Sequence, residues 1–188
     1  MKKYLFSVVI LSMGMGALPV FAQQGGPAGV IINHYAANNF VAGAIPGADL
    51  DRIVQAGIRA PSARNRQPWR FTVVQNLALA KKIVPQTLDG NALIVISAEG
   101  DGKTNGAEIL DCALAAESVY LAAQALGYGS RIYTGPIDGV NRSLKSDLGL
   151  PGGHNAVVLI RVGKISAGTD AVSAASRRKP AGDIVTYK

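Results

Sequence analysis

Apolar and polar positions alternate along this chain with two periods, one typical of helices and one typical of strands. The helical spacing i, i+3, i+4, i+7, i+8 predicts a helix with one buried face over 48–60, formed by Leu50, Ile53, Val54, Gly57 and Ile58. Further helices are predicted at 31–38, 77–84, 108–126 and 140–148, and strands at 70–75, 93–97, 131–134 and 156–163. Strands interleaved with helices around one core predict an α/β or α+β sandwich, and periodicity alone does not choose between them.

The segment 108–126 is the longest predicted helix, and it is apolar on most of its faces. Such a helix belongs in the centre of a core or at a subunit contact. It contains Cys112, the one cysteine of the chain, so no internal disulfide can form. Among alanines, Cys112 is expected to behave as a small apolar residue rather than as a nucleophile.

The first 22 residues have the pattern of a secretory signal peptide. Lys2 and Lys3 precede an apolar run over 4–18, and Ala22 ends a plausible cleavage site. The run is shorter than the roughly 20 residues that a membrane span needs. We therefore expect 1–22 to be removed, 23–30 to be a flexible leader and 31–188 to form one domain, exported to the periplasm without a stable membrane anchor.

Charge and composition exclude some partners. The chain has 19 basic and 12 acidic residues, and loss of Lys2 and Lys3 leaves a net charge of 17 − 12 = +5. The excess is modest and only 6% of residues are aromatic, so nucleic-acid binding is not expected. Two histidines and one cysteine, far apart in the sequence, give no metal-site spacing.

The most distinctive motif covers 60–69 and reads A-P-S-A-R-N-R-Q-P-W. Pro61 ends the preceding helix, because proline lacks a backbone donor and disfavours helix before it. Ser62, Asn65 and Gln67 then place hydroxyl and amide groups on a short, constrained loop. Amides both donate and accept hydrogen bonds, which suits a ligand whose edge presents both acceptors and donors.

This motif resembles the signature of the nitroreductase family, in which the segment lies along flavin mononucleotide (FMN). The resemblance assigns Ser62, Arg64, Asn65 and Gln67 to the cofactor. The stretch 126–135 resembles the family segment beside the flavin ring, which adds Thr134 and Gly135. The tail after residue 177 resembles the family's R-x-P segment, which places Arg178 on the phosphate, where a guanidinium makes paired, charge-assisted bonds.

The N-terminal segment departs from the family pattern. The family opens with R-R-S-x-R-x-F, whereas this chain reads H-Y-A-A-N-N-F over 34–40. Ala36 replaces the serine, and His34 and Asn38 stand at basic positions. These two remain cofactor-binding candidates, but the phosphate loses permanent positive charge. Weak FMN binding is expected, because each hydrogen bond to a charged group contributes about 1.5–3 kcal/mol.

The resemblance implies an α+β, three-layer sandwich with a central mixed or antiparallel sheet and a long central helix. It also implies an intertwined homodimer with the flavin between subunits, and an FMN-dependent oxidoreductase. Hydride would pass from a reduced donor, with NAD(P)H as candidate, to a nitroaromatic, a quinone or a similar small-molecule acceptor. No side chain is assigned as a catalytic acid or base. Because these cofactors are made in the cytosol, export leaves an alternative open: a non-catalytic periplasmic ligand-binding module on a degenerate nitroreductase fold.

Overall fold

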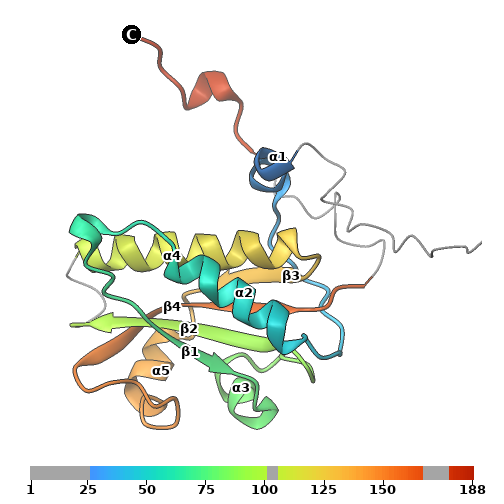
Figure 1. The fold of residues 1–188 in the computed structure, drawn as a ribbon, viewed down its shortest axis with the longest axis vertical. Helices are drawn as coiled ribbons and strands as arrows, with labels where there is room; N and C mark the ends of the chain where they lie inside the picture. Colours follow the sequence, from blue (N-terminus) through green and yellow to red (C-terminus); the bar gives the residue numbers. More distant parts are fainter. Residues whose placement is uncertain (1–25, 101–105, 167–177) are drawn as a thin grey trace, which may run out of the picture.

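The computed structural model describes residues 26–100, 106–166 and 178–188, and its centre is a four-stranded sheet (Figure 1). Every pair of neighbours in the sheet is antiparallel, in the order β1-β2-β4-β3. The strands confirm the four predicted ones with slightly shifted ends: β1 (Arg70–Val74), β2 (Ala92–Glu99), β3 (Gly129–Tyr133) and β4 (His154–Gly163).

Helices cover both faces of the sheet. Figure 1 shows α2 (Gly47–Ile58) and α4 (Gly106–Ala125) on one face, and α3 (Leu77–Ile83) and α5 (Ile137–Ser143) on the other. Residues 92–98 of β2 are all buried, which explains the unbroken apolar run over 92–96, because a strand covered on both faces needs no polar side. The expected three-layer α+β sandwich is confirmed, and the antiparallel pairing decides against α/β.

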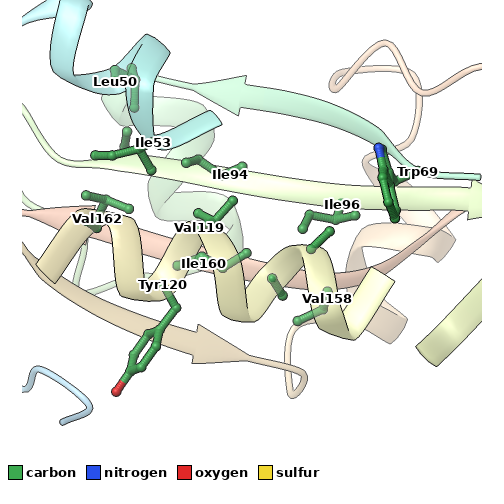
Figure 2. Close-up of a cluster of buried hydrophobic side chains, with 14 of the residues drawn as sticks. Leu50, Ile53, Trp69, Ile94, Ile96, Val119, Tyr120, Val158, Ile160 and Val162 are labelled. Atoms are coloured by element: carbon green, nitrogen blue, oxygen red, sulfur yellow. The ribbon is translucent and has the colours of Figure 1, made fainter. Parts of the chain in front are cut away.

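The larger core cluster lies between α2, α4 and the sheet (Figure 2). Ile53 of α2, Val119 of α4 and Ile160 of β4 meet there, each fully buried. Gly57 lets the two helices approach each other closely. A Cβ at position 57 would lie 2.7 Å from Cγ2 of Val119 and 2.8 Å from Cε1 of Phe71, so the absent side chain is part of the packing.

The N-terminal segment differs from the prediction. Helix α1 spans Gly26–Asn33, so residues 26–30 of the predicted leader are helical, and the predicted helix over 31–38 stops at Asn33. The reason is a buried side chain of α4. The N–H of Tyr35 donates to Oε1 of Gln124, and Nε2 of Gln124 donates to the carbonyl of Tyr35. These bonds hold the backbone of Tyr35 in an extended segment that crosses the end of α4.

Helix α5 also begins and ends earlier than predicted. It starts directly after Pro136 and stops at Ser143, whereas the prediction was 140–148. Leu144 and Leu148 still pack in the apolar interior, although turns carry them rather than helix. Two short 3-10 helices complete the described chain, η2 (Ala63–Asn65) and η3 (Ala181–Asp183). The small residues and weak periodicity of 166–176 predict a loop, and this stretch lies outside the described residues apart from Ser166.

In the part of the chain that the structure describes, no helix combines the length and the apolar character needed to cross a membrane.

Candidate functional site

The loop between α2 and β1 has an unusual backbone. Arg64 and Asn65 have φ of 55° and Gln67 has φ of 48°, which places three non-glycine residues in the left-handed region within four positions. Side chains other than glycine enter this region at a cost of about 1–3 kcal/mol each, and such residues concentrate at functional sites. The loop that the sequence motif singles out is therefore also the most strained described segment of the backbone.

Hydrogen bonds within the loop maintain this shape. The N–H of Gln67 donates to Oγ of Ser62 at 3.1 Å, and Nε2 of Gln67 donates to Oδ1 of Asn65 at 3.1 Å. The side chains of Arg64, Asn65 and Gln67 are exposed. Arg66 is exposed as well, and its guanidinium lies 3.7 Å from Glu108 at the start of α4. The structure thus brings Ser62, Asn65 and Gln67 together and presents polar groups to solvent.

A narrow apolar slot lies beside Thr134, between α4 and the edge of the sheet. It has a volume of about 200 Å³ and is lined by Ile109, Ala113, Ala116, Ile132, Thr134, Val157 and Val158. A dry cavity of roughly 150 Å³ is enough to hold a benzene ring. The slot can take the apolar edge of a planar ring, with one hydroxyl at its rim. Gly135 lies apart from the slot and lines a polar hollow beside α5 with Lys82 and Pro136.

The ring of His34 packs against Tyr120 in the last turns of α4, and the charge of Arg178 acts on the same tyrosine. The rings of His34 and Tyr120 meet edge to face, with 5.5 Å between centroids and an interplanar angle of 81°. Burial raises the pKa of Tyr120, while a hydrogen bond with Gln124 and the positive charge of Arg178 lower it. Arg178 is therefore close enough to Tyr120 to act on it electrostatically.

Asn38 is not part of the group around Tyr120. Its Oδ1 accepts a hydrogen bond from Nη1 of Arg131 in β3. Residues paired across neighbouring strands point to the same face of a sheet. Arg131 pairs with Arg161, and Arg161 pairs with Leu93, which packs in the core beneath α3 and α5. The side chain of Asn38 thus turns toward the other face of the sheet from the one that α4 covers.

Helix α4 separates the predicted site residues of one chain. Tyr120 follows Asp111, the residue beneath the motif loop, by nine positions (120 − 111), or about 14 Å along the helix axis. Asp111 and Ile109 of the slot are two positions apart, and residues at that spacing do not face each other. One chain therefore places the motif loop, the slot and the residues His34 and Arg178 at three separate places on α4.

Two buried polar residues of α4 support these places, and the sequence analysis missed both. Asp111 accepts a hydrogen bond from the N–H of Ala63 at 2.9 Å, and Gln124 holds the segment that carries His34. The sequence did contain a signal for both residues. A polar residue inside an otherwise apolar, alanine-rich helix needs a specific hydrogen-bond partner when it is buried.

Cys112 is confirmed as a buried apolar residue. Its side chain is inaccessible, and burial, followed by the charges of Asp111 and Glu108, raises the pKa of the thiol to about 12. The nucleophilic thiolate is therefore suppressed. Among the residues that the structure covers, no cluster of three or more histidine, cysteine, aspartate or glutamate side chains could hold a metal ion.

A three-layer α+β domain with this loop at the start of its long helix has the architecture of the nitroreductase class of oxidoreductases. The model of the nitroreductase family matches residues 33–99 and 89–164. The matches together span well over half of the chain, so the protein belongs to the nitroreductase family and is an oxidoreductase of that class.

Individual relatives agree with this assignment. An Archaeoglobus fulgidus protein named "Putative NADH dehydrogenase/NAD(P)H nitroreductase" is 35% identical over 120 residues, covering 58% of this chain and 67% of the relative. A nitroreductase from Bacteroides fragilis, solved with bound FMN, superposes with a TM-score of 0.70 at 22% identity, over 87% of this chain and all of that one. A nitroreductase with bound FMN from Desulfitobacterium hafniense gives 0.69 at 24% identity, over 86% of this chain and 97% of that one.

Proposed function

We propose that this protein is an FMN-dependent oxidoreductase that passes hydride from a reduced donor, with NAD(P)H as the candidate, to a nitroaromatic, a quinone or a similar small acceptor. The observation that carries the proposal is the left-handed loop 62–67 on α4, in a chain of the nitroreductase family. When bound, FMN supplies the redox chemistry, and the protein supplies binding and orientation.

The donor set fits this cofactor. The amides of Asn65 and Gln67 and the hydroxyl of Ser62 offer donors and acceptors to the polar edge of a ring, with Arg64 beside them. The slot at Thr134 would offer an apolar surface to the opposite edge, contributed by the second copy in the dimer proposed below. Arg178, with His34 when protonated, offers positive charge to the phosphate. Position 38 offers no positive charge to the phosphate, because Asn38 is neutral and accepts a hydrogen bond from Arg131.

We further propose that the active form is a homodimer. The motif loop and the slot of one chain lie on different sides of α4, and the helix surface between them carries exposed leucines. Leu110 is 60% exposed and Leu114 is 38% exposed. Exposed apolar surface of this kind marks a contact. A second copy packed on Leu110 and Leu114 would bring its own loop 62–67 toward the slot of the first chain.

The direct test is a titration of the purified protein with FMN, followed by flavin fluorescence and by the ultraviolet–visible spectrum. We expect saturable binding in the micromolar range, which corresponds to about −8 kcal/mol. Arg178→Ala should weaken binding at least tenfold, whereas Lys179→Ala, a neighbouring cation without an assigned role, should not. Reduction by NADH or NADPH and reoxidation by a nitroaromatic or a quinone then test the reaction.

No binding of FMN at high micromolar concentration would remove the flavin chemistry. It would favour the alternative function, a non-catalytic periplasmic module that uses the same surfaces to hold another planar or anionic ligand. The discriminating measurement is the colour of the protein as isolated, because bound flavin is yellow.

We also propose export to the periplasm with cleavage after Ala22, on the basis of the charged and apolar pattern of residues 1–22. The intact mass of protein recovered from the periplasm tests this. A mass that still includes residues 1–22, or recovery of the protein only from the cytosol, contradicts it.

A further inference from the structure

The carboxylate of Asp111 is deeply buried, and one of its two oxygens accepts a hydrogen bond. The residue is 2% exposed. Its Oδ1 accepts from the N–H of Ala63 at 2.9 Å, while its Oδ2 is buried and has no hydrogen-bond partner. A buried, half-satisfied carboxylate is unfavourable for stability, so its presence needs an explanation other than packing.

In the part of the chain that the structure describes, no lysine, arginine or histidine forms an ion pair with Asp111. Glu108 lies one helical turn earlier on α4 and is also acidic. The guanidinium of Arg66 lies 3.7 Å from Glu108. An apolar residue at position 111 would avoid the desolvation cost of the carboxylate. What the carboxylate provides is an acceptor, fixed on a rigid helix and directed at the backbone of the loop.

The bond from Ala63 links the backbone of the strained loop to that helix. The other hydrogen bonds within 62–67 join residues of the loop to one another: Gln67 to Ser62, Gln67 to Asn65, Asn65 to Ser62 and Arg66 to Ala63. Internal bonds define a shape but do not hold that shape in place on the domain. Ala63 directly precedes Arg64, the first left-handed residue, so an anchor here fixes where the left-handed backbone begins.

We propose that Asp111 is a positioning residue that anchors the cofactor loop to α4 through the N–H of Ala63 and so keeps Arg64, Asn65 and Gln67 in their left-handed conformation. The inference rests on the proposed function for its link to FMN. Asp111 acts through the loop and does not itself contact the cofactor.

Trp69 gives a readout that does not depend on flavin. It is the one tryptophan of the chain, it is 4% exposed, and it ends the motif that contains the loop. In the flavin-free protein, Asp111→Ala should red-shift the emission of Trp69 and increase its quenching by acrylamide. The same variant should weaken FMN binding by about tenfold or more, the scale of one charge-assisted hydrogen bond. Asp111→Asn keeps an acceptor oxygen at this position and should stay within about threefold of the wild type in both measurements.

Two further variants keep the test decisive. Ala63→Pro deletes the donor instead of the acceptor, at the first position of η2 and after the extended residue Ser62, where proline is tolerated. It should reproduce the Asp111→Ala phenotype, and it replaces that variant if Asp111→Ala does not fold. Asp49→Ala is the matched control. Asp49 accepts a 2.7 Å bond from Tyr128 away from the loop, so its loss should lower stability and leave Trp69 and FMN affinity unchanged.

The outcomes separate the two proposals. Wild-type Trp69 emission and wild-type FMN affinity in both Asp111→Ala and Ala63→Pro would overturn the anchoring role. A changed Trp69 signal in these variants, together with no FMN binding by any form of the protein, would support the anchor and remove the flavin function.

Discussion

The guanidinium carbon of Arg161 lies 4.0 Å from the centroid of the Phe40 ring, directly over its face. Arg161 is 3% exposed, and its Nε and Nη2 donate to Oδ1 of Asn91 at 3.0 and 2.7 Å. Asn91 in turn donates to the carbonyl of Val41 at 3.1 Å. A buried cation, a neutral amide and an aromatic face thus tie the N-terminal segment to the central strand β4.

This arrangement predicts that Asn91 is more sensitive to mutation than Arg161. Asn91→Ala leaves the buried guanidinium without its acceptor and should lower the free energy of unfolding by about 2–3 kcal/mol. Arg161→Met replaces the charged side chain with a shorter, unbranched apolar one and should lower the free energy of unfolding by less. Urea denaturation measures both variants. An equal or larger loss for Arg161→Met would contradict the prediction.

Arg64→Gly should separate stability from binding. Glycine adopts positive φ without steric cost, so this change should leave the free energy of unfolding unchanged or raise it by up to about 1 kcal/mol. The same change removes a side chain proposed to contact FMN and should weaken FMN binding. Thermal denaturation and flavin titration give the two values. Unaltered affinity would remove Arg64 from the contact set.

Leu114→Glu should convert the proposed dimer into a monomer, because it places a charge in the apolar surface of α4. Leu88→Glu is the matched control, since both leucines are 38% exposed and Leu88 lies in a loop away from α4. Light scattering at micromolar concentration should give half the wild-type mass for Leu114→Glu and the full mass for Leu88→Glu. A wild-type protein that is itself monomeric would remove the proposed shared site.

Gly57→Ala should destabilise the packing of α2 on α4 by about 1–3 kcal/mol, the usual cost of overfilling a core. Gly47→Ala is the control in the same helix, because a Cβ at position 47 meets nothing within 4 Å. It should be neutral or slightly stabilising. Comparison of the two melting temperatures checks the prediction, and equal melting temperatures would contradict it.

Alkaline pH should destabilise the fold. Burial raises the pKa of Cys112 from 9.0 to about 12, and burial with the hydrogen bond to Asp49 raises that of Tyr128 from 10.0 to about 12. Both groups stay protonated to a higher pH in the folded protein than in the unfolded chain. Their contribution to the free energy of unfolding is therefore complete below about pH 9 and is lost as the pH rises toward 12. The urea midpoint should fall over this window, and more gently in Cys112→Ala and Tyr128→Phe. A decline as steep as that of the wild type in both variants would contradict this assignment.

Periodicity was sufficient to find the strands and the core helices, because burial on one or both faces leaves a direct trace in the sequence. It failed at residues 34–38, where two hydrogen bonds between Gln124 and the backbone of Tyr35, rather than any local preference, decide the backbone conformation. For the same reason, no pattern in the sequence could place Asn38 beside Arg131.

The sequence motif correctly located the loop 62–67, but it did not predict the backbone conformation of that loop. Left-handed conformations are usually read from glycine, and this loop has none, so the strain at Arg64, Asn65 and Gln67 was not visible in the sequence. The anchoring contact was hidden too, since 48 positions separate Ala63 from Asp111. The separation of the candidate residues along α4 likewise emerges only from the tertiary structure.

The position of β4 constrains when the domain can fold during synthesis. This strand lies in the middle of the sheet and pairs with both β2 and β3, yet it is the last strand to be made. Until His154–Gly163 has left the ribosome, β3 has no partner and one edge of β2 is open. A nascent chain therefore cannot complete its sheet until most of its length has been synthesised, which is compatible with the proposed export because a translocation channel passes unfolded chains.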